Sequence, residues 1–454
     1  MSERIVVYGA GFMGERLVEQ MKLEPAQTHL PIGFLDEDPA LRGRTIHGVP
    51  VLGGLDDLNA IASEYRPDTL VIAIASIGRS RVRELEALCR ELGLSLGVLP
   101  TLSDILNTAS SRVEVNPVTE VDLLGRQAMV TDEAAIRQLV EGSTVLVTGA
   151  GGSIGFELTR QLSRYGPRRL VLLDRDESAL QSTQLALEGH GLLDSDDIVL
   201  ADIRDAPWIN EVFETVRPQL VFHAAALKHL PMLERYPNEA WKTNIVGTRN
   251  IISAGQRSGV EVLVNISTDK AADPISVLGQ TKLVTEFLTW QANECGDSGA
   301  TQSRFMSVRF GNVLGSRGSV LTIFQRQVAN GECVTVTDPE VTRYFMTIQE
   351  AVHLVLQAAV IGKGGETLVL DMGDPVQILD VARQAIARSG RDVPIQFTGL
   401  RKGEKMHEVL VGKKETNHAG PHPSIVHISR SAEDLESLRD LPDYFIEGLG
   451  LIDD

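Results

Sequence analysis

The sequence predicts an α/β protein with two doubly wound domains, because two glycine-rich turns each lie between an apolar strand and a helical pattern. Gly9–Gly14 follows an apolar run at residues 4–8. Gly149–Gly155 follows a second apolar run at residues 145–148 and precedes a helical pattern at residues 156–165. A chain of 454 residues has room for two or three domains of the usual size, about 150 residues each.

Composition and charge indicate a globular protein of the reducing cytosol. Hydrophobic residues make up 43% of the chain, enough for large cores, and the net charge of −18 disfavours non-specific binding to nucleic acid. Cys89, Cys295 and Cys333 stand apart without metal-ligand spacing, so we expect neither a disulfide framework nor a metal site. Apolar runs stay below the ~18 residues of a membrane-spanning helix, and the chain opens into a strand rather than a secretory signal. We therefore expect a cytoplasmic protein.

The second glycine-rich turn has the spacing of a dinucleotide-binding fingerprint. Gly149, Gly152 and Gly155 allow a tight turn, a close approach of the backbone to a pyrophosphate, and close packing of helix on strand. The next strand ends at Asp174, about 20 residues further on, where a carboxylate binds the adenosine ribose hydroxyls and repels a 2′-phosphate. The sequence therefore favours NAD as the cofactor, while the adjacent Arg175 leaves NADP open.

Further cofactor contacts are expected from the start of the helix, the ends of later strands and two later helices. These residues are Ser153, Ile154, Asp202, Ile203, Ala224, Ala225, Ala226, Asn244 and Lys282. The alternative interpretation is a glycine-rich turn followed by a surface aspartate, with no cofactor.

The first glycine-rich turn leaves two interpretations open. Gly9, Gly11 and Gly14 precede an amphipathic run, and the following strand ends at Asp36, so the parts come in the same order. The segment is either a second nucleotide or effector site, or a Rossmann-type domain whose glycines serve only the turn and the packing.

One stretch places a hydroxyl, an acid and an amine together. An apolar strand at residues 262–266 delivers Thr268, Asp269 and Lys270 to its C-terminal end, and Lys282 follows in the next segment. In a dinucleotide-binding enzyme these groups would lie beside the nicotinamide.

Leu278 stands four residues before Lys282, where a reductase usually carries a tyrosine. The stretch is therefore suited to hydride and proton transfer, but not to alcohol oxidation by a tyrosine base. In the alternative interpretation, Asp269 and Lys270 form a solvated charge pair, and Lys282 and Glu286 merely stabilise a surface helix through their i, i+4 spacing.

Several motifs that follow in order along the chain carry a resemblance to a known family. They are His223–Met232 (HAAALKHLPM), Ser267–Lys270 (STDK), Arg309–Ser319 (RFGNVLGSRGS), Thr342–Thr347 (TRYFMT) and Gly399–Lys405 (GLRKGEK). Together they resemble the bacterial polysaccharide-biosynthesis (CapD-like) family of nucleotide-sugar 4,6-dehydratases, within the extended short-chain dehydrogenase/reductase superfamily. The resemblance covers about residues 140–412.

The resemblance implies a domain organisation. Residues 1–105 resemble the family's additional N-terminal Rossmann-like (CoA-binding-like) domain, and residues 106–140 would connect it to the next. Residues 141–318 are the expected NAD-binding catalytic domain, an extended short-chain dehydrogenase/reductase. Residues 319–454 are expected to form mainly its small substrate-binding region, with residues 349–390 partly returning to the catalytic domain. Many relatives begin with membrane-spanning helices, and this chain resembles a soluble member that lacks them.

The resemblance also implies a reaction. A UDP-N-acetylhexosamine, expected to be UDP-N-acetylglucosamine, is oxidised at C4, loses water across C5 and C6, and is reduced at C6 to a 4-keto-6-deoxy sugar. Asp269 is the expected acid and Lys270 the expected C5 base, provided that burial raises the pKa of the acid and lowers that of the amine. Direct ion pairing would oppose both shifts. Thr268 would hydrogen-bond the C4 oxygen, and Lys282 would hold the nicotinamide ribose. The 4-hydroxyl would be deprotonated by Asp269 or by a water linked to Lys282.

Substrate contacts are expected from basic and amide side chains in the later motifs. Lys228 and His229 would meet the sugar, and Asn312, Arg343, Arg401 and Lys405 the diphosphate and uridine. His223 is expected to be packed and hydrogen-bonded rather than catalytic.

Two alternative functions remain open. One is a nucleotide-sugar 4- or 5-epimerase, which Leu278 disfavours because epimerases of this superfamily depend on the tyrosine that it replaces. The other is a non-catalytic nucleotide-sugar sensor. Whichever function applies, the resemblance implies a homo-oligomer that pairs through helices at residues 239–258 and 277–296.

Overall fold

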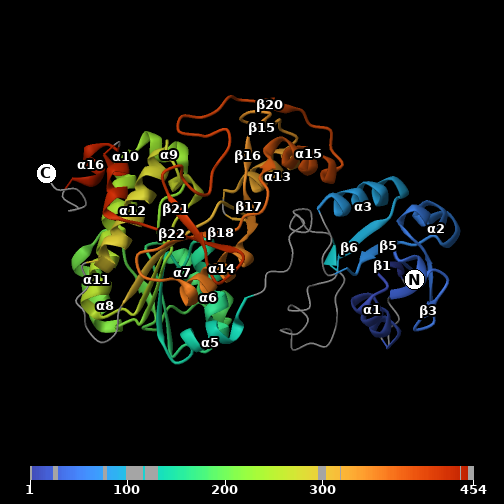
Figure 1. The fold of residues 1–454 in the computed structure, drawn as a ribbon, viewed down its shortest axis with the longest axis horizontal. Helices are drawn as coiled ribbons and strands as arrows, with labels where there is room; N and C mark the ends of the chain where they lie inside the picture. Colours follow the sequence, from blue (N-terminus) through green and yellow to red (C-terminus); the bar gives the residue numbers. More distant parts are fainter. Residues whose placement is uncertain are drawn as a thin grey trace. The chain divides into compact units, whose positions relative to one another are not determined.

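The computed structural model describes residues 3–23, 29–74, 79–98, 116–117, 131–294, 303–316, 318–439 and 441–447. The chain divides into two compact units, Met1–Val130 and Thr131–Asp454, and each is built around a largely parallel β-sheet (Figure 1). The predicted α/β class with two Rossmann-type doubly wound domains is therefore confirmed. Cys295, Arg317 and most of the predicted connecting segment lie outside the described residues.

The first unit has seven strands in the order β3-β4-β2-β1-β5-β6-β7. Its strands are β1 (Glu3–Tyr8), β2 (His29–Leu35), β3 (Thr45–Ile46), β4 (Val49–Gly53), β5 (Thr69–Ile72), β6 (Ser95–Val98) and β7 (Asn116–Pro117); its helices are α1 (Phe12–Leu23), α2 (Leu58–Tyr65) and α3 (Arg79–Leu92). The central strand β1 is buried on both faces: Ile5 and Val7 join one apolar cluster, and Val6 and Tyr8 join another. This alternation explains why the strand reads as an uninterrupted apolar run.

The second unit is built on a nine-stranded sheet in the order β10-β9-β8-β11-β12-β13-β18-β22-β21. These strands are β8 (Thr144–Thr148), β9 (Arg169–Asp174), β10 (Ile198–Leu200), β11 (Leu220–His223), β12 (Val262–Ile266), β13 (Arg304–Arg309), β18 (Thr367–Leu370), β21 (Thr416–Ala419) and β22 (Ile425–Ser429). The sheet is parallel from β10 to β18, and β22 and β21 add an antiparallel edge. The strand order reverses direction between β8 and β11, so the carboxyl edge opens there for a ligand.

Short strand pairs lie in the later part of the second unit. They are β14 (Asn312–Leu314) with β17 (Phe345–Thr347), β15 (Val334–Val336) with β20 (Ile395–Phe397), and β16 (Thr342–Arg343) with β19 (Val376–Gln377).

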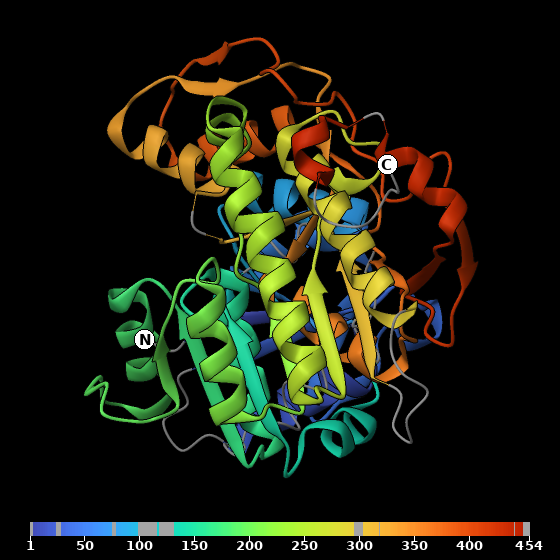
Figure 2. The ribbon, with the colours of Figure 1, turned by 90° about the vertical axis from the view of Figure 1, so that its left-hand side faces the viewer.

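The helices of the second unit are α5 (Glu133–Val140), α6 (Ser153–Leu162), α7 (Glu177–Glu188), α8 (Ala206–Val216), α9 (Leu230–Arg235), α10 (Pro237–Ala240), α11 (Gly247–Ser258), α12 (Val277–Glu294), α13 (Val320–Asn330), α14 (Ile348–Ile361), α15 (Ile378–Ser389) and α16 (Asp443–Ile446). Helices cover both faces of the nine-stranded sheet, whereas α13 and α15 pack against each other and the short strand pairs. Figure 2 shows α8, α11 and α12 side by side over one face, and a π-helical turn at Trp241–Val246 joins α10 to α11. No helix in the described part of the chain is both long enough and apolar enough to cross a membrane.

Two strands end before the cofactor residues that were expected at strand ends. β10 ends at Leu200, before Asp202 and Ile203, and β11 ends at His223, before Ala224, Ala225 and Ala226. The last hydrogen bond between β11 and β8 runs from the Ala224 amide to the Thr148 carbonyl. After it, the chain of β8 turns away at Gly149. The small residues beyond therefore form loops at the open edge of the sheet.

Helix α12 is buried almost all round, so its polar residues are bonded inside the protein. From Thr281 to Thr289 every side chain is buried. The hydroxyls of Thr281, Thr285 and Thr289 donate to carbonyls of their own helix, and Lys282 donates to the carbonyl of Ile266. The interpretation of Lys282 as part of a surface helix is therefore wrong.

A group of four buried charges ties α12 and β13 to the C-terminal strands. Arg309, fully buried, donates to Glu286 (Nη2–Oε2 2.7 Å) and to Glu415 (Nη1–Oε2 2.8 Å), and Arg430 contacts both carboxylates. Burial alone would raise the pKa of Glu415, but Arg309 and Arg430 hold it down at about 2. We call Glu286, Arg309, Glu415 and Arg430 the buried charge cluster; its two positive and two negative charges balance.

Candidate active site

The glycine-rich turn between β8 and α6 leaves no room for side chains. Gly149 has a φ of +70°, and a Cβ there would lie 2.6 Å from the amide nitrogen of Ala225. A Cβ on Gly155 would lie 2.0 Å from the carbonyl oxygen of Gly149. Gly152 is the N-cap of α6 and supplies no side-chain acceptor, so no N-cap side chain accepts from the first backbone amides of the helix. Such a turn at a helix N-terminus suits a phosphate group.

Asp174, at the end of β9, holds this turn in shape. One carboxylate oxygen accepts from the amide of Gly151 (2.9 Å), and the other accepts from the amide of Asp176 (3.0 Å). The same side chain also lines the cleft described next, so its orientation toward a ligand is determined by the backbone on both sides.

A cleft of about 250 Å³ lies at the carboxyl edge of the sheet, beside the glycine turn. Its lining includes the predicted cofactor residues Gly149, Gly152, Asp174, Arg175, Asp202, Ile203, Ala224, Ala225 and Ala226. Further lining residues are Gly151, Leu173, Asp176, Ala179, Ala201, Leu227 and Thr243. The predicted Ser153, Ile154, Gly155, Asn244 and Lys282 are not part of this lining. The cleft adjoins the N-terminus of α6, so it fits an extended, phosphate-containing ligand.

Asn244 stands behind the cleft rather than in it. Its fully buried amide accepts from the amide of Leu227 (2.8 Å) and donates to the carbonyl of the same residue (3.1 Å) and to Thr281 (3.1 Å). It therefore fixes the loop that carries the alanines and connects that loop to α12. His223 is likewise buried between Thr148 and Thr248, and burial lowers its pKa to about 3.

Thr268, Asp269 and Lys270 follow β12, which neighbours β11 in the sheet. Asp269 is fully buried, and its Oδ1 accepts from the Thr268 hydroxyl (3.0 Å) and from Lys270 Nζ (2.9 Å). Its Oδ2 has no hydrogen-bond partner in the described part of the chain, and a Cβ on Gly311 would lie 2.9 Å from it. An unpartnered buried oxygen costs free energy, which is tolerated where the group is needed for function.

Lys270 does not meet the condition expected of a base. Burial lowers its pKa, but the carboxylates of Asp269 and Glu408 outweigh that effect, so the pKa of Lys270 is raised. The expected lowering is wrong for this structure, because the two residues form a direct ion pair and a second carboxylate lies 3.7 Å away. The interpretation as a solvated charge pair is also wrong, since Asp269 is buried and only 16% of the Lys270 side chain is exposed.

Glu408 belongs to this site but was not among the residues predicted from the sequence. Its carboxylate is buried, with Oε1 3.7 Å from Lys270 and Oε2 3.6 Å from Lys405. Oε2 has no hydrogen-bond partner among the described residues. Glu408 comes from a loop distant in sequence, and only its place next to the predicted GLRKGEK motif signalled it.

The residues predicted to bind the diphosphate and uridine lie in three different surroundings. Asn312 accepts from Lys270 Nζ (3.3 Å), and Lys405 donates to the carbonyl of Ala272 (2.7 Å), so both lie around the Asp269–Lys270 pair. Arg343 is buried and bound to Glu404 (2.8 Å) and to backbone carbonyls, which leaves it a structural part of this wall. Arg401 is exposed on the same loop.

Lys228 and His229 lie on the loop after β11, and both are exposed. His229 is the N-cap residue of α9, and a Cβ on Gly318 would lie 2.9 Å from its ring. The loop after β11 thus faces the glycine-rich segment that follows β14.

Leu278 packs into an apolar cluster instead of reaching the ion pair. It is buried with Leu233 and Ala240, and Leu227 and Val277 lie against them. At the position of the usual tyrosine the chain therefore has no hydroxyl, while Lys282 keeps its contact with Ile266 (2.8 Å). Burial lowers the pKa of Lys282 to about 8.

Comparison with known proteins identifies the family. The sequence pattern of the family described as polysaccharide biosynthesis protein matches residues 145–430, and that of a CoA-binding domain matches residues 1–100. The chain belongs to the polysaccharide biosynthesis protein family. Within this family it is 38% identical over 439 residues to the probable polysaccharide biosynthesis protein EpsC of Bacillus subtilis, covering 95% of this chain and 72% of that protein.

Two further relatives bear on chemistry. The inverting UDP-N-acetylglucosamine 4,6-dehydratase of Campylobacter jejuni is 32% identical over 283 residues, which cover 62% of this chain and 80% of that protein. A UDP-glucose 4-epimerase of Rickettsia rickettsii is 34% identical over 310 residues, or 67% of this chain and 87% of that protein. This polysaccharide biosynthesis protein is therefore a nucleotide-sugar-modifying member of the short-chain dehydrogenase/reductases.

Solved structures show the same fold. The X-ray structure of Pen from Bacillus thuringiensis superimposes with a TM-score of 0.58 at 32% identity, over 64% of this chain and 88% of that one. The Thermus thermophilus UDP-glucose 4-epimerase, solved with NAD, gives a TM-score of 0.51 at 22% identity, over 60% and 90%.

Proposed function

We propose that the protein is an NAD-dependent UDP-N-acetylhexosamine 4,6-dehydratase that acts on UDP-N-acetylglucosamine. The observation that carries the proposal is the buried Asp269–Lys270 ion pair at the carboxyl edge of the dinucleotide-type sheet, with Leu278 where a tyrosine base would stand. Elimination of water needs a base for the C5 proton and an acid for the departing C6 hydroxyl, and the Asp269–Lys270 pair holds one group of each kind.

The cleft residues fit NAD. Gly149 and Gly152 leave the backbone open to the pyrophosphate, and the start of α6 supplies amides and the positive end of a helix dipole. Asp174 suits the adenosine ribose hydroxyls and disfavours a 2′-phosphate, so NAD is preferred over NADP. When bound, NAD supplies a reversible hydride acceptor.

The Asp269–Lys270 pair supplies the acid and the base. In the ion pair the proton is on Lys270, but transfer along the 2.9 Å hydrogen bond from Nζ to Oδ1 gives an amine and a carboxylic acid. A sugar that excludes water favours this neutral form, because desolvation destabilises both charges. The amine then accepts the C5 proton, and the Asp269 carboxyl donates a proton to the departing C6 hydroxyl.

Oxidation at C4 proceeds without a tyrosine in this proposal. The Thr268 hydroxyl hydrogen-bonds the C4 oxygen, and a water held by Lys282 accepts the hydroxyl proton, because Asp269 is already protonated in the neutral pair. The ammonium of Lys282 also reduces the cost of negative charge on that oxygen. Arg401, Lys228 and His229 contribute the exposed polar contacts to the nucleotide and the sugar.

The proposed role of Lys282 predicts a pH dependence. Since its pKa is about 8, its charge is lost as the pH rises through that value, and we expect turnover to fall above pH ~8. A Lys282→Arg variant keeps its charge to a much higher pH, so its lower turnover should lack the alkaline decline. Initial rates from pH 6 to 10 give the comparison, and the same alkaline decline in both proteins would contradict this role.

The first test of the function is the product formed in D₂O. We expect UDP-N-acetylglucosamine to lose one water, to gain a C6 methyl signal in the proton NMR spectrum, and to carry deuterium at C5. When the reaction is run in H₂O, C5 carries a proton, and the presence or absence of a nuclear Overhauser contact between H3 and H5 reports retention or inversion at C5.

An epimerase is the second candidate, because the Rickettsia relative carries that name. It would give a product of unchanged mass with inverted configuration at C4. Binding of NAD and nucleotide sugar without any product would instead support a sensing protein. Either outcome would remove the dehydratase proposal.

A further inference from the structure

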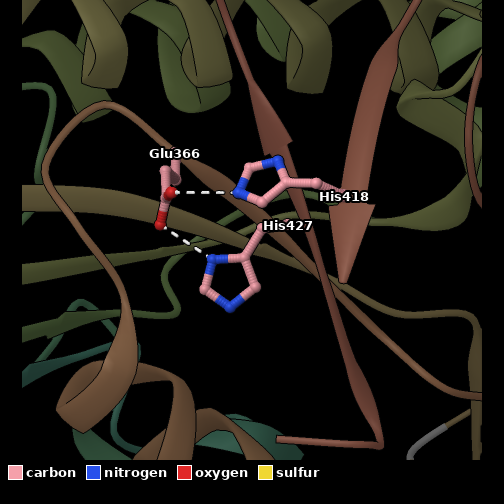
Figure 3. A group of neighbouring side chains, drawn as sticks. All are labelled: Glu366, His418 and His427. Carbon is pink, nitrogen blue, oxygen red and sulfur yellow. Dashed lines mark hydrogen bonds and ion pairs between the residues drawn. The ribbon is translucent and has the colours of Figure 1, made fainter. Parts of the chain in front are cut away.

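Two histidines and a glutamate converge at the antiparallel edge of the nine-stranded sheet, apart from the proposed active site (Figure 3). His427 Nδ1 lies 2.9 Å from Glu366 Oε2, and His418 Nε2 lies 3.8 Å from Glu366 Oε1. One ligand atom from each residue lies within 4.8 Å of the others. We call Glu366, His418 and His427 the edge cluster.

Strand register brings the three side chains to one face of the sheet. His418 on β21 is paired directly with His427 on β22, and His427 is paired with Leu368 on β18. Glu366 precedes β18 and lies two residues before Leu368, so by the alternation of a strand it faces the same side. The cluster therefore joins three neighbouring strands, of which two are the antiparallel addition to the parallel sheet.

The backbone holds two of the three residues rigidly. The carbonyl of Glu366 accepts from the amide of Ser307 (3.0 Å), and its Oε2 accepts from the amide of Lys363 (2.9 Å). The His427 ring is 2% exposed and covered by the turn at Gly420, where a Cβ would lie 2.2 Å from the ring. Metal sites on rigid strands with hydrogen-bonded ligands are the well-organised ones.

The present contacts leave the cluster incompletely satisfied. The Nδ1 of His427 and the Nε2 of His418 both point to the Glu366 carboxylate, while the buried Nε2 of His427 lies on the far side of its ring and has no hydrogen-bond partner among the described residues (Figure 3). The separation between His418 Nε2 and Glu366 Oε1 is too long for a hydrogen bond, although the two atoms face each other. Electron-pair donors so close together need protons or a cation between them.

We propose that the edge cluster binds one zinc-class divalent ion, through Glu366, His418 and His427. Imidazole nitrogens and a carboxylate oxygen suit zinc, whose bonds of about 2.0–2.2 Å place tetrahedral ligands ~3.3 Å apart. The three ligand atoms lie within 4.8 Å of one another, and the half-exposed His418 side chain can move to close the remaining gap. Three ligands leave a fourth position for water.

Such an ion would fasten β21 and β22 to β18. These two strands adjoin the segments that carry Glu415 and Arg430 of the buried charge cluster. Because the ligands come together only in the folded sheet, binding would stabilise the native state. The role is structural and independent of the dehydratase proposal.

Zinc titration of the chelator-treated full-length protein tests the proposal. We expect one saturable zinc ion per chain by calorimetry, and a rise in Tm of about 5 °C at a hundredfold excess over Kd. Cobalt(II) at the same site should give the visible absorption of a low-coordinate ion. His418→Ala removes one of three ligands at an accessible position, and we expect at least a tenfold weaker Kd and loss of the cobalt band.

His190→Ala is the matched control. His190 Nε2 lies 3.6 Å from Glu188 and its side chain is 49% exposed, against 47% for His418, but it belongs to no such cluster among the described residues. This variant should bind zinc like the parent protein. Absence of saturable zinc binding at micromolar concentration would overturn the proposal, as would zinc binding that survives His418→Ala, for example at the exposed Cys333.

Discussion

Asp269→Asn is expected to lower turnover of UDP-N-acetylglucosamine by about 10²- to 10⁴-fold, the usual contribution of a positioned acid or base. The amide keeps an oxygen to accept from Thr268 and Lys270, so the local geometry is conserved. The amide has no acidic proton that it could transfer to the C6 hydroxyl. It also removes the carboxylate that lies 2.9 Å from the Lys270 amine. Rates of water loss, followed by mass spectrometry, measure the effect.

NAD binding supplies the control for this prediction. Asp269 does not line the cleft beside the glycine turn, so the Kd for NAD should stay within about twofold of the parent protein. Thr268→Val removes the neighbouring hydroxyl without changing a charge, and it should reduce turnover less than Asp269→Asn. An Asp269→Asn protein that retains turnover near the parent rate would refute the acid role.

Much of the fold could be predicted because its signals are local. Strand β12 has the bounds that its apolar pattern indicates, since it is an apolar run closed by turn residues. The glycine turn and Asp174 could be placed at one cleft for the same reason: their spacing along the chain determines their geometry.

The electrostatic state of the site could not be predicted, because it depends on contacts between distant segments. The pKa of Lys270 is raised partly by Glu408, which a separate loop brings to it. Arg343 reads as a phosphate ligand in the sequence, yet Glu404 and two carbonyls already occupy its guanidinium. The edge cluster was missed because its ligands lie on three strands with no fixed spacing.

Glu286→Ala is expected to have the largest effect on stability, lowering the free energy of unfolding of the second unit by about 3–5 kcal/mol. Glu286 and Arg309 are fully buried, and Arg430 is nearly so. Removing the glutamate leaves two buried arginines with Glu415 alone, so one buried positive charge is uncompensated. It also removes the acceptor of the Ser267 hydroxyl, next to the proposed catalytic residues. Urea unfolding at pH 7 measures the loss.

Two comparisons separate this buried charge effect from the removal of any ion pair. Asp380→Ala breaks the exposed pair with Arg383, at 38% and 64% side-chain exposure, and should cost less than about 1 kcal/mol.

The buried charge cluster should also stabilise the fold less in acid. The folded pKa of Glu415, about 2, lies below its ordinary value of 4.5, so its stabilisation is complete above pH ~4.5 and is lost as the pH falls toward 2. Urea unfolding of the parent protein should therefore show its stability falling between pH ~4.5 and 2, and an equal cost for both alanine variants at pH 7 would show that the buried cluster does not stabilise the fold.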